Sequence, residues 1–98
     1  MYYHDPGTQA EIRRRAREGR IIITDHCRVR EEDRDIEDIE IHRCLKNGVL
    51  EGEDWNPQYQ DTVYRMALKQ GLTATLVVVV ALSDAHDIAV TVFRREKR

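Results

Sequence analysis

Several kinds of sequence signal are scarce or missing in this chain of 98 residues. Its two cysteines, Cys27 and Cys44, form no metal-binding motif. The longest apolar run, LVVVVAL, has seven residues, which is far too short to cross a membrane. No P-loop and no serine-nucleophile motif is present, and the glycines are too sparse to hold a phosphate. We therefore expect no metal, no cofactor and no membrane partner.

The environment of the protein is predicted from its thiols and its first residues. Two cysteines give no disulfide framework, and the opening MYYHDPG lacks the charged and apolar regions of a signal peptide. These features predict a cytoplasmic protein, either a monomer or a homodimer. With 41% hydrophobic and 35% charged residues, the chain is expected to form one domain, 1–98, with a modest core.

Charge is unevenly distributed along the sequence. Residues 11–20 carry five arginines against two glutamates, and residues 94–98 carry four basic residues against one acid. Residues 25–40 hold eight acids and three arginines. Folding could bring the two basic segments together as a positive patch for nucleic acid, or each could be an ordinary solvated face.

The first half, residues 1–48, has the signals of helices. Predicted helices span 8–18, about 25–33, and about 37 to the stop at KNG. Asp5 or Thr8 would cap the first helix, Thr24 or Asp25 the second, and Glu37 the third. Ile36 and Ile41 have the spacing of a hydrophobic staple around Glu37. Residues expected to be buried are Ile12, Ala16, Cys27, Val29, Ile41, Cys44 and Leu45. Gly48 is expected to end the third helix at positive φ.

The second half, residues 49–98, has the pattern of a β-meander. VLEGED predicts a short strand, and TVYRMALK alternates so that Tyr64, Met66 and Leu68 share one face. LTATLVVVVAL and IAVTVFRR predict two further strands, separated by turns at QG and SDAHD. RIIIT, between the first two helices, predicts a short extended segment. The fold expected is α+β, with two or three N-terminal helices packed on a three- or four-stranded antiparallel sheet.

His26, Arg30 and Arg34 stand four residues apart in the second predicted helix. Steps of four rotate by about 40°, so the three side chains share one stripe of a regular helix. Imidazole can exchange a proton near neutral pH, and guanidinium groups bind phosphate oxygens. This set suits metal-independent RNA cleavage through the 2′-hydroxyl. The alternative is that the arginines pair with the neighbouring acids and that His26 only bonds to the backbone.

Three further features have a structural and a functional interpretation. His86 stands beside Asp84 and Asp87, where an ordinary turn is favoured over a metal site. His42 is expected to face solvent on the third helix. Trp55 and Tyr59 could stack on bases, although a tryptophan at such a position more often closes the edge of a small core.

The segment from His26 to Gly48 resembles a bacterial family, the domain-of-unknown-function family 4258. The resemblance rests on His26-Cys27-x-x-Arg30-x-x-x-Arg34-x-Ile36, followed by Ile41, Leu45 and Asn-Gly at 47–48. It extends over about residues 20–95 and includes the strand VTVFRR. Cys27 stands for the usual alanine, Glu31 for the usual methionine and Phe93 for the common tyrosine of the last strand.

That family is similar in pattern to small toxin-like endoribonucleases of the RelE and MqsR type, which share the barnase type of fold. The resemblance implies a helical layer on an antiparallel sheet, an RNA-binding or RNA-cleaving surface, and restraint by a partner antitoxin. The residues implied for catalysis are His26, Arg30, Arg34 and Tyr64, the last as a phenol in place of the one that Phe93 lacks. The residues that we predict to bind RNA are Arg65, Arg94 and Arg95. The alternative is a non-catalytic protein-interaction module, or an inactive relative of such toxins.

Overall fold

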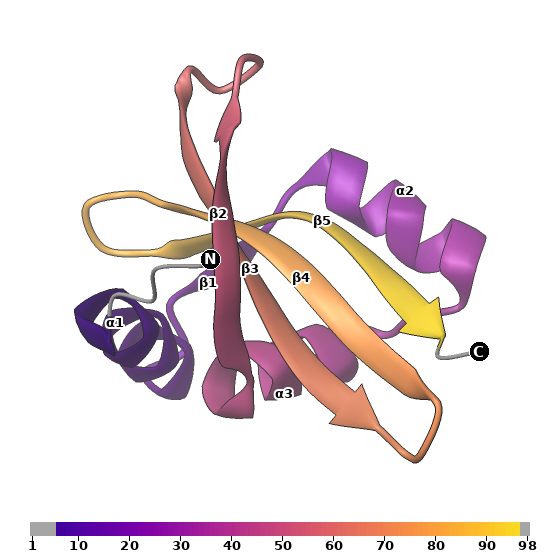
Figure 1. The fold of residues 1–98 in the computed structure, drawn as a ribbon. Helices are drawn as coiled ribbons and strands as arrows, with labels where there is room; N and C mark the ends of the chain where they lie inside the picture. Colours follow the sequence, from indigo (N-terminus) through magenta and orange to yellow (C-terminus); the bar gives the residue numbers. More distant parts are fainter. Residues whose placement is uncertain (1–5, 97–98) are drawn as a thin grey trace.

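Three helices and five strands follow one another in the computed structural model, which describes residues 6–96 (Figure 1). The elements are α1 (Pro6–Arg17), β1 (Ile21–Ile23), α2 (Asp25–Arg34), α3 (Asp38–Asn47), β2 (Val49–Asn56), β3 (Asp61–Gln70), β4 (Ala74–Leu82) and β5 (Asp87–Glu96). The α+β class and the division into a helical and a strand half are as predicted. No helix within this range is long and apolar enough to span a bilayer.

The sheet has one strand more than the sequence predicts, in the order β1-β5-β4-β3-β2. β2 to β5 form the expected antiparallel meander, but β1 joins it in parallel to β5, from Ile21↔Asp87 to Ile23↔Ala89. The prediction of an all-antiparallel sheet was therefore wrong at this edge. Three consecutive isoleucines favour extended backbone, but their sequence does not show which distant strand they pair with.

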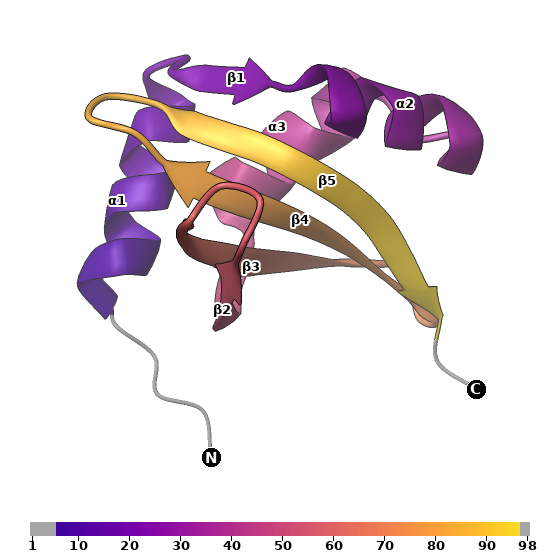
Figure 2. The ribbon, with the colours of Figure 1, turned by 90° about the horizontal axis from the view of Figure 1, so that it is seen from above.

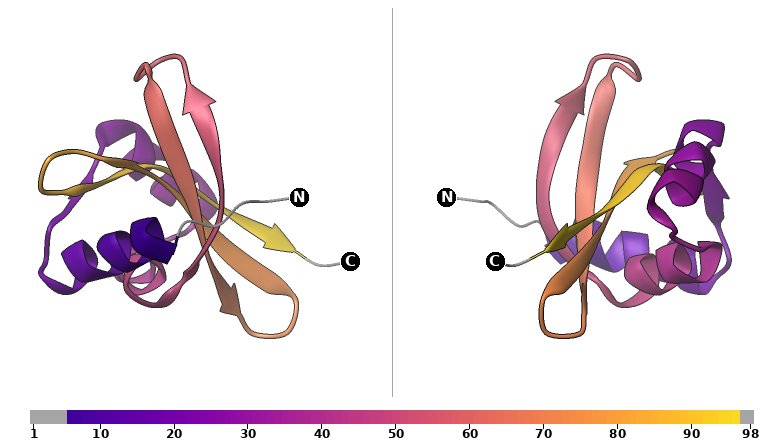
Figure 3. Two further views of the ribbon diagram at one scale, coloured as in Figure 1. Left: turned by 60° about the vertical axis from the view of Figure 1, so that its left-hand side comes forward. Right: turned by 90° about the vertical axis from the view of Figure 1, so that its right-hand side faces the viewer.

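All three helices lie on the same side of the sheet (Figure 3). α1 packs against α3, α3 crosses β3 and β4, and α2 runs beside β5. β1 and α2 follow one another along the length of β5 (Figure 2). The main core lies between the helices and this face of the sheet. Its fully buried larger side chains include Ile12, Ile41, Leu45, Met66, Leu76, Val78, Val80 and Val92.

Local signals set the starts of α2 and α3 as predicted. Thr24 caps α2, where its hydroxyl accepts the Cys27 N–H at 3.2 Å. Glu37 caps α3 in a capping box with Glu40. Ile36 and Ile41, the proposed staple, are both buried in the main core. For α1, Thr8 lies inside the helix rather than at its start, and Asp5 lies outside the described residues.

Two expectations about the helical half were wrong. Val29 is 51% exposed, because the inner side of α2 is taken by Cys27 and Glu31. Gly48 ends α3 with φ −72° rather than at positive φ. Glycine is needed there for space, since a Cβ would lie 2.5 Å from the Cys44 oxygen and 2.8 Å from the Ala67 oxygen.

The strand alternation places β3 as predicted. Tyr64, Met66 and Leu68 face the helices, and Val63, on the other face, joins a small cluster with Ala81 and Val90. The β2–β3 hairpin projects beyond the rest of the sheet, with its turn at residues 57–60 (Figure 1). The molecule therefore has a helix-covered face, an open face and a protruding hairpin.

Candidate functional site

The candidate stripe His26, Arg30 and Arg34 lies on α2, which is fastened to β5 at both ends. At the start of the helix, the Thr24 hydroxyl donates to the Ala89 carbonyl at 3.0 Å. At its end, Arg34 Nη1 donates to the Val92 carbonyl at 2.8 Å. These bonds hold α2 in place along the strand.

Arg34 therefore stabilises the fold through its guanidinium group. β1 pairs with β5 only as far as Ala89, so the later part of β5 would otherwise leave edge carbonyls without a partner. The Arg34 guanidinium satisfies the carbonyl of Val92, 58 residues away in sequence. This bond gives Arg34 a positioning role for α2.

His26 and Arg30 remain on the solvent side of the stripe. His26 is exposed, and Arg30 is half-exposed. Arg30 Nη1 pairs with Asp33 Oδ2 at 3.0 Å, across one turn of the same helix. Such exposed pairs contribute less than about 1 kcal/mol and are screened by salt. An incoming phosphate could displace Asp33 at small cost.

Arg94 is more deeply engaged than any other predicted RNA-binding residue. Its guanidinium donates to the Arg34 carbonyl at 2.9 Å, to Gln70 Oε1 at 3.1 Å and to Glu40 Oε1 at 2.9 Å. Burial alone would raise the pKa of Glu40, but hydrogen bonds from the Glu37 backbone, Gln70 and Arg94 lower it below its usual value. Arg94 thus links β5 to the end of α2 and to α3, on the helix-covered face.

Arg65 and Arg95 lie together on the open face of the sheet. Arg95 forms a two-bond pair with Glu51 at 2.5 Å, and Arg65 Nε lies 3.9 Å from the same carboxylate. Arg65 also bonds to Asp54. Tyr64, the neighbour of Arg65, faces the opposite side and is half-buried against the main core. The predicted set is therefore divided among α2, the helix-covered face and the open face.

As far as residues 6–96 show, the two basic segments do not form a common patch. α1 lies against the start of β5, whereas Arg94 and Arg95 are at its far end (Figure 1). Within α1, Arg13 donates to the Gly48 carbonyl, and Arg15 donates to the Ser83 and His86 carbonyls at 2.7 and 3.1 Å. Residues 97 and 98, part of the C-terminal basic segment, lie outside the described residues.

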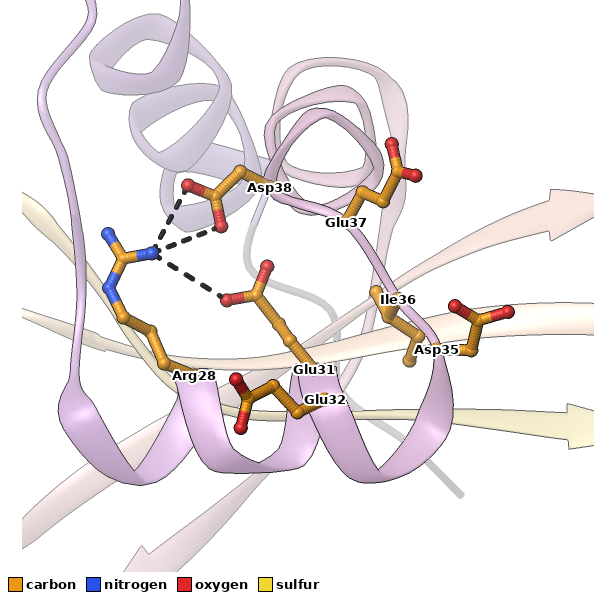
Figure 4. Close-up of a pocket in the computed structure, with 7 residues that line it drawn as sticks. All are labelled: Arg28, Glu31, Glu32, Asp35, Ile36, Glu37 and Asp38. Carbon is orange, nitrogen blue, oxygen red and sulfur yellow. Dashed lines mark hydrogen bonds and ion pairs between the residues drawn. The ribbon is translucent and has the colours of Figure 1, made fainter.

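A hollow between α2 and α3 carries strong negative charge (Figure 4). Arg28 Nη1 lies 3.3 Å from Asp38 and 4.0 Å from Glu31. Burial and a hydrogen bond to Asp38 raise the pKa of Glu31 to about 7, and the same bond lowers the pKa of Asp38. Of these two carboxyl groups, Glu31 is therefore the one that holds a proton more readily. The residues lining the hollow are Arg28, Glu31, Glu32, Asp35, Ile36, Glu37 and Asp38.

The acidic hollow and the candidate stripe occupy different sides of α2. Glu31 follows Cys27 by four residues, on the side of α2 that faces the core and α3. His26 and Arg30 are displaced from these two residues by about 100°, the rotation of one residue. The carboxylates of the hollow are therefore directed away from the stripe. Asp33, which pairs with Arg30, does not line the hollow.

The burial of one carboxyl group was not predicted from the sequence. Asp87 is fully buried at the start of β5, and neither of its carboxyl oxygens has a hydrogen-bond partner among residues 6–96. Burial raises the pKa of Asp87 to about 7, against the opposing effect of Arg15. The sequence predicts only that Asp87 ends a turn. Its burial could not be predicted, because α1 and β1, which cover it, are distant in the sequence. The turn itself is confirmed by the bond from the His86 N–H to Ser83 Oγ at 3.0 Å.

The two thiols lie in environments that disfavour the thiolate form. Cys27 and Cys44 are buried, and burial raises the pKa of each thiol to about 12. Residues 6–96 contain no group of three or more His, Cys, Asp or Glu that could hold a metal ion. Trp55 is 64% exposed and Tyr59 42%, so the expectation that the tryptophan closes a core edge was wrong.

Comparison with known proteins identifies a family for most of the chain. The profile described as domain of unknown function, DUF4258, matches residues 23–94. This range includes all of α2 and α3 and extends from β1 to Arg94 near the end of β5. Neither the curated proteins nor the solved structures give a match.

Proposed function

The chain belongs to the DUF4258 family, and we propose that it binds RNA through the exposed part of α2 and cleaves it without a metal ion. His26 accepts the proton of a 2′-hydroxyl, and Arg30 binds the oxygens of the adjacent phosphate. Arg34 positions both residues by fastening α2 to β5.

The observation that supports this proposal most is the arrangement of the stripe on α2. His26 and Arg30 are one helical turn apart, face solvent, and lie on a helix whose two ends are bonded to the Ala89 and Val92 carbonyls. A rigid helix can hold an imidazole and a guanidinium group at a fixed separation, as positional catalysis requires. Arg65 and Arg95 are left out of the proposed site because they lie on the open face of the sheet, away from α2. Arg94 is left out because its guanidinium is bonded to the Arg34 carbonyl, Gln70 and Glu40.

The chemistry follows from these two groups. Removal of the 2′-hydroxyl proton lets that oxygen attack phosphorus, which forms a 2′,3′-cyclic phosphate and releases the 5′-oxygen of the next nucleotide. The leaving oxygen then takes up a proton. Guanidinium binding stabilises the charge that builds on the phosphate oxygens. Histidine is suited to the proton transfer because it can both accept and donate near neutral pH.

The direct test is cleavage of several single-stranded RNAs by purified protein in EDTA. We expect products ending in a 2′,3′-cyclic phosphate, and a loss of at least 100-fold in rate for His26→Ala. His42→Ala is the matched control, since it removes a histidine from α3 and should leave the rate unchanged. Absence of cleavage by the wild-type protein, or equal rates for wild type and His26→Ala, would contradict the enzymatic part of the proposal.

A second candidate function is a protein-interaction module of the same fold. It is favoured by the acidic hollow between α2 and α3, which repels a nucleic-acid backbone. A toxin of the RelE type would also need such a surface for a restraining partner. This function predicts no RNA affinity at any salt concentration, whereas phosphate binding predicts affinity that falls steeply with salt.

A further inference from the structure

Strand β2 is the last strand of the sheet, and its two ends differ in what covers them. Near its start, Arg13 donates to the Gly48 carbonyl at 2.8 and 2.6 Å, and the Leu50 N–H donates to Gln9 at 2.8 Å. Beyond Leu50 no other strand of residues 6–96 pairs with its outer side. The edge from Glu51 to Asn56 therefore presents backbone donors and acceptors over about 20 Å.

The side chains around this edge carry one sign of charge. Residues 49–61 contain four acids and no lysine, arginine or histidine. Glu51 and Asp54 are paired with arginines of the open face. Glu53, on the other side of β2, is exposed and forms no ion pair with any residue from 6 to 96. A free carboxylate thus stands directly on the open edge.

Two exposed aromatic rings lie beside the same edge. Trp55 follows Glu53 by two residues on β2, so both side chains share one face of the strand. Tyr59 lies in the adjoining turn and is 42% exposed. Aromatic faces attract the cationic ends and the methylene groups of lysine and arginine side chains.

The acidic charge and the exposed rings of the edge decide which kind of molecule can bind there. A second copy of β2 would set Glu53 and Asp54 against the same acids, which disfavours pairing between copies. RNA would be repelled by the same charges. A basic peptide in an extended conformation could form backbone hydrogen bonds with the edge, an ion pair with the carboxylate of Glu53, and contacts with the rings of Trp55 and Tyr59.

We propose that the outer edge of β2, from Glu51 to Asn56, binds an extended, lysine- or arginine-rich segment of a partner protein by β-strand addition. Backbone hydrogen bonds supply affinity, Glu53 pairs with a basic side chain, and Trp55 and Tyr59 contact the next. β2 and α2 lie at opposite ends of the sheet, so the interaction is independent of the RNA-binding proposal and leaves the α2 stripe uncovered.

The test uses a seven-residue peptide of alternating lysine and threonine as the probe. Trp55 is the sole tryptophan of the chain, so its fluorescence reports occupancy of this edge directly. We expect a saturable change in that signal, with amide shifts in NMR spectra confined to β2 and the hairpin turn. The same peptide with alternate N-methylated residues keeps its charge but loses backbone donors, and it should bind at least tenfold more weakly.

Charge reversal on the protein completes the test. Glu53→Lys should weaken the probe at least tenfold, whereas Glu32→Lys, the same change at an exposed position of α2, should alter affinity less than twofold. Thermal melts of both variants establish that they fold. The proposal is overturned by absence of binding, by equal binding of the N-methylated peptide, by equal weakening in the two variants, or by shifts centred on the acidic hollow. Concentration-dependent dimers that mask the edge would overturn it in favour of a second copy of the chain.

Discussion

Two charged regions of the molecule, the α2–α3 side and the β2–β3 hairpin, use similar residues in different ways. On the α2–α3 side, Arg34 and Arg94 are bonded to backbone carbonyls, and burial beside Asp38 raises the pKa of Glu31. On the hairpin, Glu53 and Trp55 extend into solvent without a partner among the described residues. The same chemical groups therefore stabilise the fold in one region and remain open for recognition in the other.

The largest difference in stability is expected between alanine variants of two adjacent arginines of β5. Arg94→Ala removes bonds to the Arg34 and Asp35 carbonyls, to Gln70 and to Glu40. We expect the free energy of unfolding to fall by about 2–3 kcal/mol. Arg95→Ala removes an exposed pair with Glu51, and should cost about 0.5 kcal/mol. Urea denaturation measures both. Equal losses for the two variants would mean that the α2–α3 side is no more tightly bonded than the open face.

A smaller effect concerns the proton held between α2 and α3. The pKa of Glu31 is about 7 in the folded chain, against an ordinary 4.5. Between these pH values the folded state keeps a proton that the unfolded state releases, so stability falls as the pH rises from about 4.5 to 7. The side chain introduced by Glu31→Gln cannot titrate. The free energy of unfolding of this variant should therefore exceed that of the wild type by on the order of 1 kcal/mol at pH 8, and the two should be equal near pH 5.

The control for this pH dependence is the neighbouring exposed residue. Glu32→Gln should leave the stability profile unchanged, since Glu32 is exposed and forms no ion pair with residues 6–96. Unfolding measured by circular dichroism from pH 4.5 to 8 compares the three proteins. A difference between wild type and Glu31→Gln that stays constant across this range would contradict the raised pKa of Glu31, because Asp87, whose pKa is also about 7, contributes equally to both proteins.

The smallest effect is expected on the hairpin. Trp55→Ala should change the free energy of unfolding by less than about 0.5 kcal/mol, because the ring is largely exposed. A tryptophan that closed a core would cost about 3–5 kcal/mol on the same substitution. Thermal and urea unfolding of this variant therefore tests whether the hairpin is free for recognition or contributes to the core.

Local signals predicted much of the fold, whereas contacts between distant segments did not appear in them. Thr24 and Glu37 cap helices through contacts with residues only three positions away in the sequence. The alternation of side chains along β3 predicted correctly which of them face the helices. The parallel pairing of Ile21 with Asp87 depends on residues more than 60 positions apart, and no local pattern encodes it. For the same reason, the sequence led to a prediction of positive φ at Gly48, the usual reason for a glycine after a helix. The close approach of the Ala67 backbone, which excludes a side chain at this position, could not be predicted.

The candidate site shows the same limit. Spacing placed His26, Arg30 and Arg34 on one helix, and the structure has all three on α2. Spacing could not show that Arg34 bonds to Val92, because that acceptor belongs to a strand edge created by the short length of β1. The sequence can therefore identify a basic residue as a candidate for binding, but its role depends on which acceptors within the fold it contacts.

The most direct measurement of the central claim is the salt dependence of RNA binding by wild type and Arg30→Ala. The logarithm of the association constant should fall linearly with the logarithm of salt concentration for the wild type. Loss of the Arg30 phosphate contact should make that slope shallower by about 0.7, the value for one contact to a single strand. Identical slopes for the two proteins, or no RNA affinity even at low salt, would contradict an RNA-binding role for α2.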